Sequence, residues 1–215
     1  MSRKHRGFTI VELMLAMTVL SVLLLAIAML VIQIGRVYTK GVTLKSLNQV
    51  ATTMSRDIQN TLNQSEAGLT QQVKQATKSG RLCTGYVSYV WNAASDTPNG
   101  ALGPNVYAAP NDSKALRFAK VPDKDNVLCR VTQTGSYAPV SYDETTELLP
   151  PGQYDFSAYE FYVGSSSSSP LRWVVMKIGT MNADTDAQAQ ECLIGASGLG
   201  DYCAINIFEF TAGSR

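Results

Sequence analysis

Histidine is almost missing from this sequence of 215 residues, which contains only His5, close to the N-terminus. A serine–histidine–aspartate triad or a histidine proton shuttle requires a histidine held within the folded domain. The sequence also lacks a glycine-rich phosphate-binding loop and an S-x-x-K motif. We therefore expect a protein that is not an enzyme and that uses no cofactor.

An excess of basic charge is missing as well. The chain has 18 Lys and Arg against 17 Asp and Glu, and three of the basic residues lie in the first seven positions, which leaves 15 against 17. Nucleic-acid-binding proteins carry a dense basic patch that neutralises phosphates, often with interleaved aromatic residues. No such cluster occurs here, so we predict no direct nucleic-acid binding.

Polar residues are missing from Leu13 to Ile32, apart from Thr18 and Ser21. A helix of this length spans about 30 Å, the thickness of the hydrocarbon core of a bilayer. The basic leader at residues 1–7 is expected to stay in the cytoplasm by the positive-inside rule. The sequence thus predicts a single-pass segment in the cytoplasmic membrane, with the remaining residues exported.

A small-residue cleavage site is missing after this segment, where a secretory signal peptide would carry one. The small residue Gly7 lies before it instead, so cleavage at Gly7 would remove the leader and retain the apolar helix. One carboxylate, Glu12, stands at the edge of the segment. A charge of this kind costs about 2.5–3.5 kcal/mol at the bilayer centre, so we expect Glu12 to require a partner.

The string Gly7-Phe8-Thr9-Ile10-Val11-Glu12-Leu13 resembles the type III signal of type IV pilins and type II secretion pseudopilins. The resemblance implies that a prepilin peptidase cleaves between Gly7 and Phe8 and methylates the new amino group of Phe8. It also implies that the apolar helices of many subunits pack as the core of an extracellular filament. In that packing the Glu12 carboxylate would meet the Phe8 ammonium of a neighbouring subunit. The alternative is a plain signal anchor, with Glu12 at the membrane interface.

A helical period continues beyond the apolar segment. Apolar residues recur at spacings of three and four, at Leu44, Leu47, Ala51, Met54, Ile58 and Leu62. One unbroken helix from Phe8 to about Leu62 would be about 80 Å long, with Gly35 and Gly41 as its weakest points. We expect four parts: a cleaved leader at 1–7, a transmembrane and filament-core helix at 8–34, an amphipathic half at 35–65 and an extracellular β domain at 66–215.

The pattern after about Gly80 changes to alternation, which is typical of strands. Runs rich in aromatic and β-branched residues predict strands at Tyr86–Trp91, Ala115–Val121, Val127–Thr132, Phe156–Val163, Leu171–Ile178 and Ala204–Phe210. The stretch from Gly164 to Pro170 suits a flexible hairpin loop, and Thr97–Asp112 suits a long surface loop. The predicted fold is α+β, a long N-terminal helix packed on one meandering antiparallel sheet, which is also what the pilin resemblance implies.

Four cysteines lie in the exported part, where two disulfides with three possible connectivities can form. We favour Cys83 with Cys129 and Cys192 with Cys203, the second closing a short loop with three glycines. Many pilins close a C-terminal loop with a disulfide, so this loop resembles theirs. Free buried thiols remain the alternative. The absence of a C-x-x-C pair argues against zinc.

The weak candidates for calcium ligands are Asn182, Asp184 and Asp186, which lie at every second position, as ligands do at the start of a calcium-binding loop. Pseudopilins and some pilins bind calcium near the C-terminal region. The glycine and the distal glutamate of an EF-hand are missing at their spacing, however, and a solvated turn explains the three residues equally.

Three functions remain. The resemblance favours a minor type IV pilin, involved in pilus assembly, adhesion, motility or DNA uptake, because major pilins are typically shorter than this chain. The expected partners are other pilin subunits through the N-terminal helix, the prepilin peptidase, an inner-membrane assembly platform and, before assembly, membrane lipid. The alternatives are a type II secretion pseudopilin and an uncleaved membrane-anchored adhesin or receptor domain.

Overall fold

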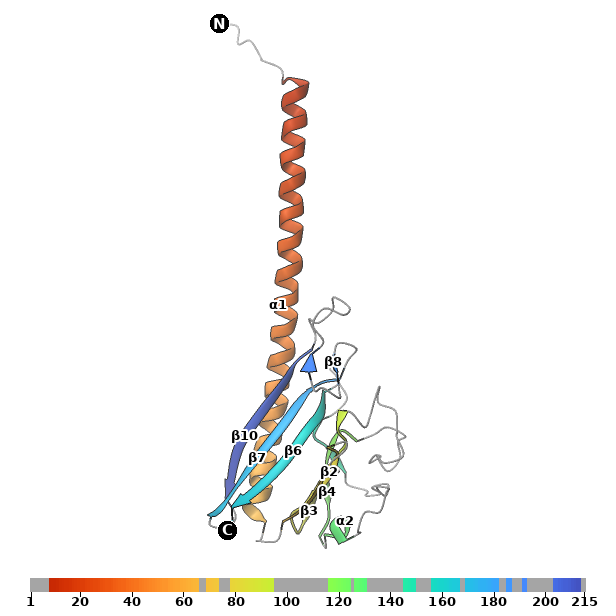
Figure 1. The fold of residues 1–215 in the computed structure, drawn as a ribbon, viewed down its shortest axis with the longest axis vertical. Coiled ribbons are helices and arrows are strands. Elements are labelled where there is room, and N and C mark those ends of the chain that lie inside the picture. Colours follow the sequence, from red (N-terminus) through yellow and green to blue (C-terminus); the bar gives the residue numbers. More distant parts are fainter. Residues whose placement is uncertain are drawn as a thin grey trace.

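The computed structural model describes a long helix whose C-terminal half is covered by β-sheets (Figure 1). The description covers residues 8–65, 69–73, 78–94, 116–124, 126–130, 145–149, 156–166, 169–181, 185–186, 191–192 and 203–213. The α+β class expected from the sequence is confirmed.

Helix α1 runs without a break through Ile10–Gln64, a length of 55 residues. Neither Gly35 nor Gly41 interrupts it, and neither has a neighbouring atom within 4 Å of the position that a Cβ would take. The absence of proline before Pro98 leaves every internal N–H able to donate along the helix. At about 1.5 Å per residue, α1 is about 80 Å long, as the sequence predicts.

The C-terminal half of α1 buries one stripe of side chains. The buried residues are Thr43, Leu47, Ala51, Met54, Ile58 and Leu62. Their spacing of three and four places them on one face of the helix. This confirms the predicted stripe, except that Leu44 is only partly buried against the core.

Five strands form the first sheet, in the order β1-β2-β3-β4-β5, with every neighbouring pair antiparallel. The strands are β1 (Thr70–Val73), β2 (Gly80–Cys83), β3 (Val87–Trp91), β4 (Phe118–Pro122) and β5 (Thr146–Glu147). Because each strand pairs with the next one along the chain, this sheet is a meander.

Three strands form the second sheet, in the antiparallel order β10-β7-β6. The strands are β6 (Phe156–Ser166), β7 (Ser169–Thr180) and β10 (Ile205–Gly213), and a separate short pair joins β8 (Thr185–Asp186) to β9 (Glu191–Cys192). β10 and β7 contact α1. The expected single sheet is therefore wrong, because the strands divide between two main sheets.

A glutamine side chain joins the two main sheets. The Gln71 amide on β1 donates to the carbonyl oxygen of Phe161 at 3.2 Å and accepts from the N–H of Val163 at 3.0 Å. Both bonded groups lie on β6, so this side chain satisfies the edge of β6 at Phe161 and Val163, where no further described strand pairs with it.

The core lies between the helix stripe and the two sheets. Aromatic rings fill its centre: Phe161 lies 5.0 Å from Trp91 and 5.1 Å from Phe118 between ring centroids, both in edge-to-face geometry. Such pairs contribute about 0.5–1.5 kcal/mol each beyond the burial of their area. The helix residues Leu47, Met54 and Ile58 belong to the same buried cluster.

The strand expected at Val127–Thr132 is wrong where the structure describes it, because Val127–Arg130 forms the short helix α2. Asn126 adopts a positive φ of 52°, which breaks an extended path. The Asp123 carboxylate then accepts a hydrogen bond from the N–H of Leu128 at 3.3 Å, as a helix-capping side chain does. Residues 131 and 132 lie outside the described part of the chain.

The loop expected between β6 and β7 is shorter than predicted. β6 continues through Gly164 to Ser166, and β7 begins at Ser169, so most of the serine-rich stretch belongs to the strands. Antiparallel pairing between the two strands is confirmed. The surface loop expected at Thr97–Asp112 lies outside the described residues.

Candidate assembly site

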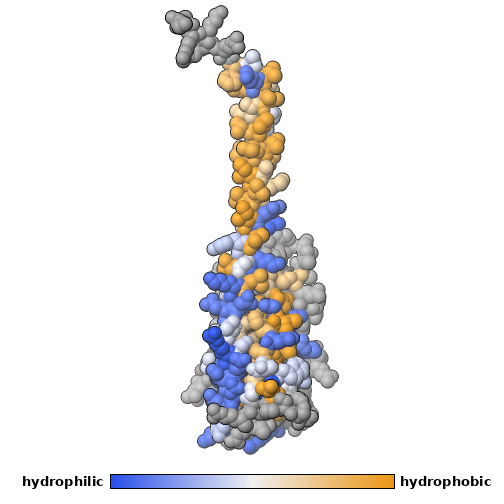
Figure 2. Space-filling view, turned by 90° about the vertical axis from the view of Figure 1, so that its left-hand side faces the viewer, coloured by the Kyte–Doolittle hydropathy of each residue, from blue (hydrophilic) through white to orange (hydrophobic). Residues whose placement is uncertain are grey.

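The N-terminal half of α1 has no covering surface within the described residues. All of its large apolar side chains are exposed, from Phe8 at 80 % to Val37 at 74 %. Figure 2 shows this half as a bare apolar column above a domain whose visible face carries both hydrophilic and hydrophobic residues. α1 is the one helix in the described part of the chain that is long and apolar enough to cross a membrane. An exposed apolar surface this large is typical of a site that contacts a membrane or another protein.

The two hydroxyl side chains within the apolar run, Thr18 and Ser21, form hydrogen bonds within the helix. The hydroxyl of Thr18 donates to the carbonyl oxygen of Leu15, and that of Ser21 donates to the carbonyl oxygen of Met17, both at 2.8 Å. Because each hydroxyl already donates its hydrogen to a backbone carbonyl oxygen, neither hydroxyl needs a hydrogen-bond acceptor from the solvent. The helix can therefore enter an apolar environment without unpaired hydroxyl donors.

The start of α1 is built around Thr9 and Glu12. Thr9 is the N-cap, with extended φ and ψ of −79° and 152°, and its hydroxyl oxygen accepts from the N–H of Glu12 at 3.3 Å. The sequence Thr9-Ile10-Val11-Glu12 has the T-x-x-E spacing of a capping box. This local role was not predicted from the sequence, although the spacing of Thr9 and Glu12 indicates it. The carboxylate also lies at the positive end of the helix dipole.

The Glu12 side chain is exposed and has no ion pair within the described residues. Phe8, the residue expected to become the new N-terminus, is described and exposed, whereas Gly7 and the rest of the leader lie outside the described residues. No charged group within the described residues therefore compensates the Glu12 carboxylate.

A polar cluster fixes α1 to the first sheet. Lys120 Nζ lies 2.8 Å from Asp57 Oδ1, and the buried Tyr89 hydroxyl donates to Asp57 Oδ2 at 2.8 Å. The same hydroxyl lies 2.7 Å from Thr61 Oγ1. Burial raises the pKa of Tyr89 well above its usual value. The cluster therefore holds a neutral phenol against a carboxylate on the helix.

A second set of polar contacts fixes α1 to β10. The Asn63 side chain accepts from the N–H of Gly213 at 3.0 Å, and the Gln59 side chain donates to the carbonyl oxygen of Thr211 at 3.2 Å. These amides satisfy backbone groups at an edge strand. The helix and the domain are thus one packed unit from Thr43 onward.

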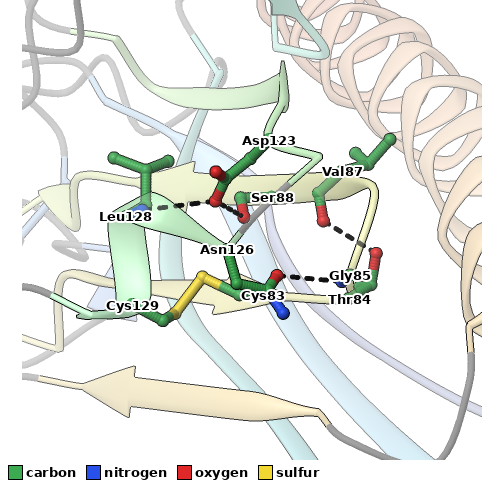
Figure 3. The surroundings of a disulfide bond; sticks show 9 residues. All are labelled: Cys83, Thr84, Gly85, Val87, Ser88, Asp123, Asn126, Leu128 and Cys129. Atoms are coloured by element: carbon green, nitrogen blue, oxygen red, sulfur yellow. Dashed lines mark hydrogen bonds between the residues drawn. A yellow bond between two sulfur atoms is a disulfide. The ribbon is translucent and has the colours of Figure 1, made fainter.

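The structure contains a disulfide between Cys83 on β2 and Cys129 on α2 (Figure 3). Figure 3 also shows Asp123 accepting from Ser88 at 2.6 Å, and Asn126 accepting from the N–H of Gly85 at 2.9 Å. Gly85 has a φ of 105°, which favours glycine. The disulfide and these bonds hold α2 against the first sheet.

A second disulfide joins Cys192 at the end of β9 to Cys203 just before β10. Both pairs are the ones favoured from the sequence. The calcium candidates Asn182 and Asp184 lie outside the described residues, and the structure describes only the backbone of Asp186 in β8. Among the described residues there is no group of three or more His, Cys, Asp or Glu that could hold a metal ion.

Comparison with known proteins identifies the N-terminal segment. Residues 2–28 match the family model of the prokaryotic N-terminal methylation motif. No curated protein sequence and no solved structure matches the chain. The matched segment contains the leader, Phe8, Glu12 and most of the bare apolar surface, and proteins with this signal are structural rather than enzymatic. The chain therefore carries at its N-terminus the type IV prepilin signal, which is the signal of pilins and pseudopilins.

Proposed function

We propose that the chain is a minor type IV pilin, a low-copy structural subunit of an extracellular filament. One observation carries the proposal: a bare apolar half-helix continues without a break into a half that is fixed to a folded domain. A flexible linker would separate the motion of an anchor from that of its domain. A continuous helix instead positions the domain relative to whatever packs on the apolar half, as a filament subunit requires.

The proposed subunit occupies two environments in turn, first the membrane and then the filament. Before assembly, the apolar half lies in the cytoplasmic membrane, with the leader in the cytoplasm and the β domain outside. Prepilin peptidase cleaves between Gly7 and Phe8 and methylates the Phe8 amino group. An inner-membrane assembly platform then transfers the subunit to the filament, where the helices of other subunits replace lipid around α1.

Glu12 is proposed as the residue that aligns the subunit in the filament. Its carboxylate has no ion pair within the described residues, and cleavage creates one cation nearby, the ammonium of Phe8. In an apolar surrounding, each charge of a pair offsets the cost of removing the other from water. A neighbouring subunit supplies the Phe8 ammonium when the helices are staggered, so charge pairing selects one stagger.

The capping geometry allows a sharp test of this role. Glu12→Gln keeps a side chain that suits a capping box but removes the charge. We expect Glu12→Gln and Glu12→Ala to insert into the membrane normally and to enter sheared filaments at least about tenfold less than the native chain, because the neighbour's ammonium is left unpaired. Thr9→Ala is the matched control, since it removes the cap but keeps the charge.

Two results would overturn the charge-pairing role. Normal incorporation of Glu12→Gln would show that capping, and not charge, is what the side chain supplies. A loss in Thr9→Ala equal to that in Glu12→Ala would lead to the same conclusion. Immunoblots of membrane and filament fractions give the readout.

A pseudopilin of type II secretion is the second candidate, because the same signal serves both machines. Deleting the gene separates the two. Loss of surface pili with normal secretion of exported enzymes supports the minor pilin. Loss of secretion with normal pili would assign the chain to the pseudopilus. An uncleaved membrane-anchored adhesin or receptor would keep its leader and affect neither machine.

A further inference from the structure

The outer face of the β10-β7-β6 sheet carries an exposed aromatic surface. Alternating residues of each strand point away from the core, while Val174, Met176 and Ile178 of β7 point into it. We call the outward group at the sheet centre the Trp173 face. It consists of Tyr162 on β6, Trp173 and Val175 on β7, and Glu209 and Thr211 on β10.

A glycine holds the central ring in place. Gly164 lies directly opposite Trp173 in the sheet, and a Cβ at Gly164 would come within 2.0 Å of the indole. The indole therefore lies against the backbone of Gly164. Tyr162 flanks it at 4.9 Å between ring centroids. Trp173 is still 48 % exposed and Tyr162 is 45 % exposed, so the face presents fixed rings to solvent.

An open groove of about 460 Å³ runs beside the indole, between β7 and β10. Its lining residues are Trp173, Val174, Val175, Glu209, Phe210 and Thr211. Glu209 is the single charged residue among them. Cross-strand pairing places Thr211 directly opposite Trp173 and Glu209 opposite Val175, so a carboxylate and a hydroxyl border the ring.

The polar groups of the face are not used by the fold. Within the described part of the chain, no hydrogen bond or ion pair engages the Glu209 carboxylate, the Trp173 indole N–H or the Tyr162 hydroxyl. Glu160, farther along β6, differs because it pairs with Lys78 at 3.6 Å. The Trp173 face therefore combines a flat apolar ring with one acceptor and several donors that are available to a ligand.

We propose that the Trp173 face binds a neutral carbohydrate. The C–H face of a pyranose ring lies against the negative face of an aromatic ring, while its hydroxyls exchange hydrogen bonds with a carboxylate and with N–H or O–H donors. Each group of the face has a role in such a complex. Indole and phenol rings supply the stacking surface, Glu209 accepts hydroxyl hydrogens, and Thr211 and the indole N–H donate to hydroxyl oxygens.

The same groups disfavour other ligands. A phosphate or sulfate would meet the Glu209 carboxylate, which also argues against single-stranded nucleic acid stacked on the indole. A quaternary ammonium would use the carboxylate and the ring faces but would leave the donors unused. A second copy of this chain would bury the face as well, and the experiment below separates that case.

The two tryptophans of the chain allow a direct assay. Trp91 is fully buried and donates to the carbonyl oxygen of Lys78, whereas Trp173 is exposed, so acrylamide quenches mainly Trp173. We expect a neutral oligosaccharide to protect this fluorescence in the full-length chain. The probes are cellohexaose, maltohexaose and chitohexaose, with choline and a heparin oligosaccharide as cationic and anionic comparisons. A polyoxyethylene detergent is required, because glycoside detergents carry the probed group.

Three variants test the individual groups, and one serves as a control. By isothermal titration calorimetry, Trp173→Ala should weaken oligosaccharide binding at least about tenfold, as removal of a central tryptophan does at other binding surfaces. Glu209→Gln should weaken it several-fold. Gly164→Ala should weaken it too, by displacing the indole without removing it. Ile207→Ala, which removes an exposed apolar side chain of β10 outside the groove, should leave binding unchanged.

The outcomes decide the proposal without reference to filament assembly. Protection by at least one neutral oligosaccharide, lost in Trp173→Ala and kept in Ile207→Ala, supports it. Binding of choline alone, binding of the heparin oligosaccharide alone, or no binding of any probe would overturn it. Trp173 protection that depends only on protein concentration would overturn it as well, because the face would then be an interface between copies of this chain.

Discussion

The two halves of α1 belong to one helix but differ in packing, because the first half is exposed and the second half packs against the folded domain. From Phe8 to Val37 every large apolar side chain is exposed, whereas from Thr43 to Leu62 one stripe is buried and the other faces are polar. Both halves have the same backbone geometry. The difference lies in the distribution of apolar residues, which surround the first half and follow a single line in the second.

This difference shows which contacts each half obtains from its own chain. The second half packs its apolar stripe against the two sheets. Its polar side chains Asp57, Gln59 and Asn63 form hydrogen bonds with groups on β3 and β10. The first half has no comparable partner in the described residues. Substitutions should therefore act on folding in one half and on membrane or filament packing in the other.

A charge placed in each half should give the largest contrast. Ile58→Asp buries a carboxylate in the core and should lower the free energy of unfolding of the domain by about 5 kcal/mol. Leu24→Asp should leave domain unfolding unchanged but oppose membrane insertion by about 2.5–3.5 kcal/mol. Urea titration of Trp91 fluorescence and a membrane-fraction assay measure the two effects. Equal loss of domain stability in both variants would contradict the division.

Removing the Cys83–Cys129 disulfide should destabilise the domain alone. With a sequence separation of 46, the double variant Cys83→Ser/Cys129→Ser should lose about 4 kcal/mol by loop entropy. The double variant Cys192→Ser/Cys203→Ser, with a separation of 11, should lose about 3 kcal/mol. Membrane insertion should be unaffected in both. Unchanged urea midpoints after reduction would argue that neither bond stabilises the fold.

A smaller effect should follow from loosening the junction between α1 and the first sheet. Tyr89→Phe removes the hydroxyl that donates to Asp57 but keeps the ring in the core. We expect a loss of about 1–2 kcal/mol in unfolding free energy, because a partly buried carboxylate loses one hydrogen bond. Thr61→Val removes the other hydroxyl of the cluster and serves for comparison. A more stable Tyr89→Phe variant would show that the cluster does not hold the helix.

The smallest predicted effect is the pH dependence of stability that arises from Glu147, whose carboxylate binds backbone N–H groups at the start of β4. Burial raises the pKa of the Glu147 carboxyl, although its Oε1 accepts from the N–H of Arg117 at 2.6 Å and of Phe118 at 3.1 Å. A carboxyl whose pKa is raised on folding stabilises the fold below its unfolded pKa, and this contribution is lost as the pH rises through the folded value. The native domain should thus lose stability as the pH rises above about 4.5. Glu147→Gln should flatten this dependence, and an unchanged slope would contradict the assignment.

Long regular elements could be predicted from the sequence, because their signal repeats. The period of three and four gave α1 and its stripe, and alternation gave β6, β7 and β10 within a few residues. Elements decided by single tertiary contacts could not be predicted. α2 depends on the positive φ of Asn126 and on the Asp123 carboxylate, and β1 is a polar stretch whose Gln71 completes the edge of β6.

The candidate site residues likewise fall into those that could be predicted from the sequence and those that could not. Phe8 and Glu12 could be proposed as site residues from the sequence because they belong to a specific motif with a fixed order of residues. The Trp173 face could not be, because Tyr162, Trp173 and Glu209 lie far apart in sequence and are joined only by the register of three strands. The role of Gly164 in leaving room for the Trp173 indole likewise becomes visible only from the strand register, which places the two residues opposite each other.

The most direct test of the account is the N-terminus of the chain in its assembled form. Sheared surface filaments and the membrane fraction should be analysed separately by mass spectrometry. The account predicts that the chain is present in the filaments and begins at N-methylated Phe8, with residues 1–7 removed. A chain that retains Met1 in the filaments, or that is cleaved but found only in the membrane under piliated conditions, would contradict it.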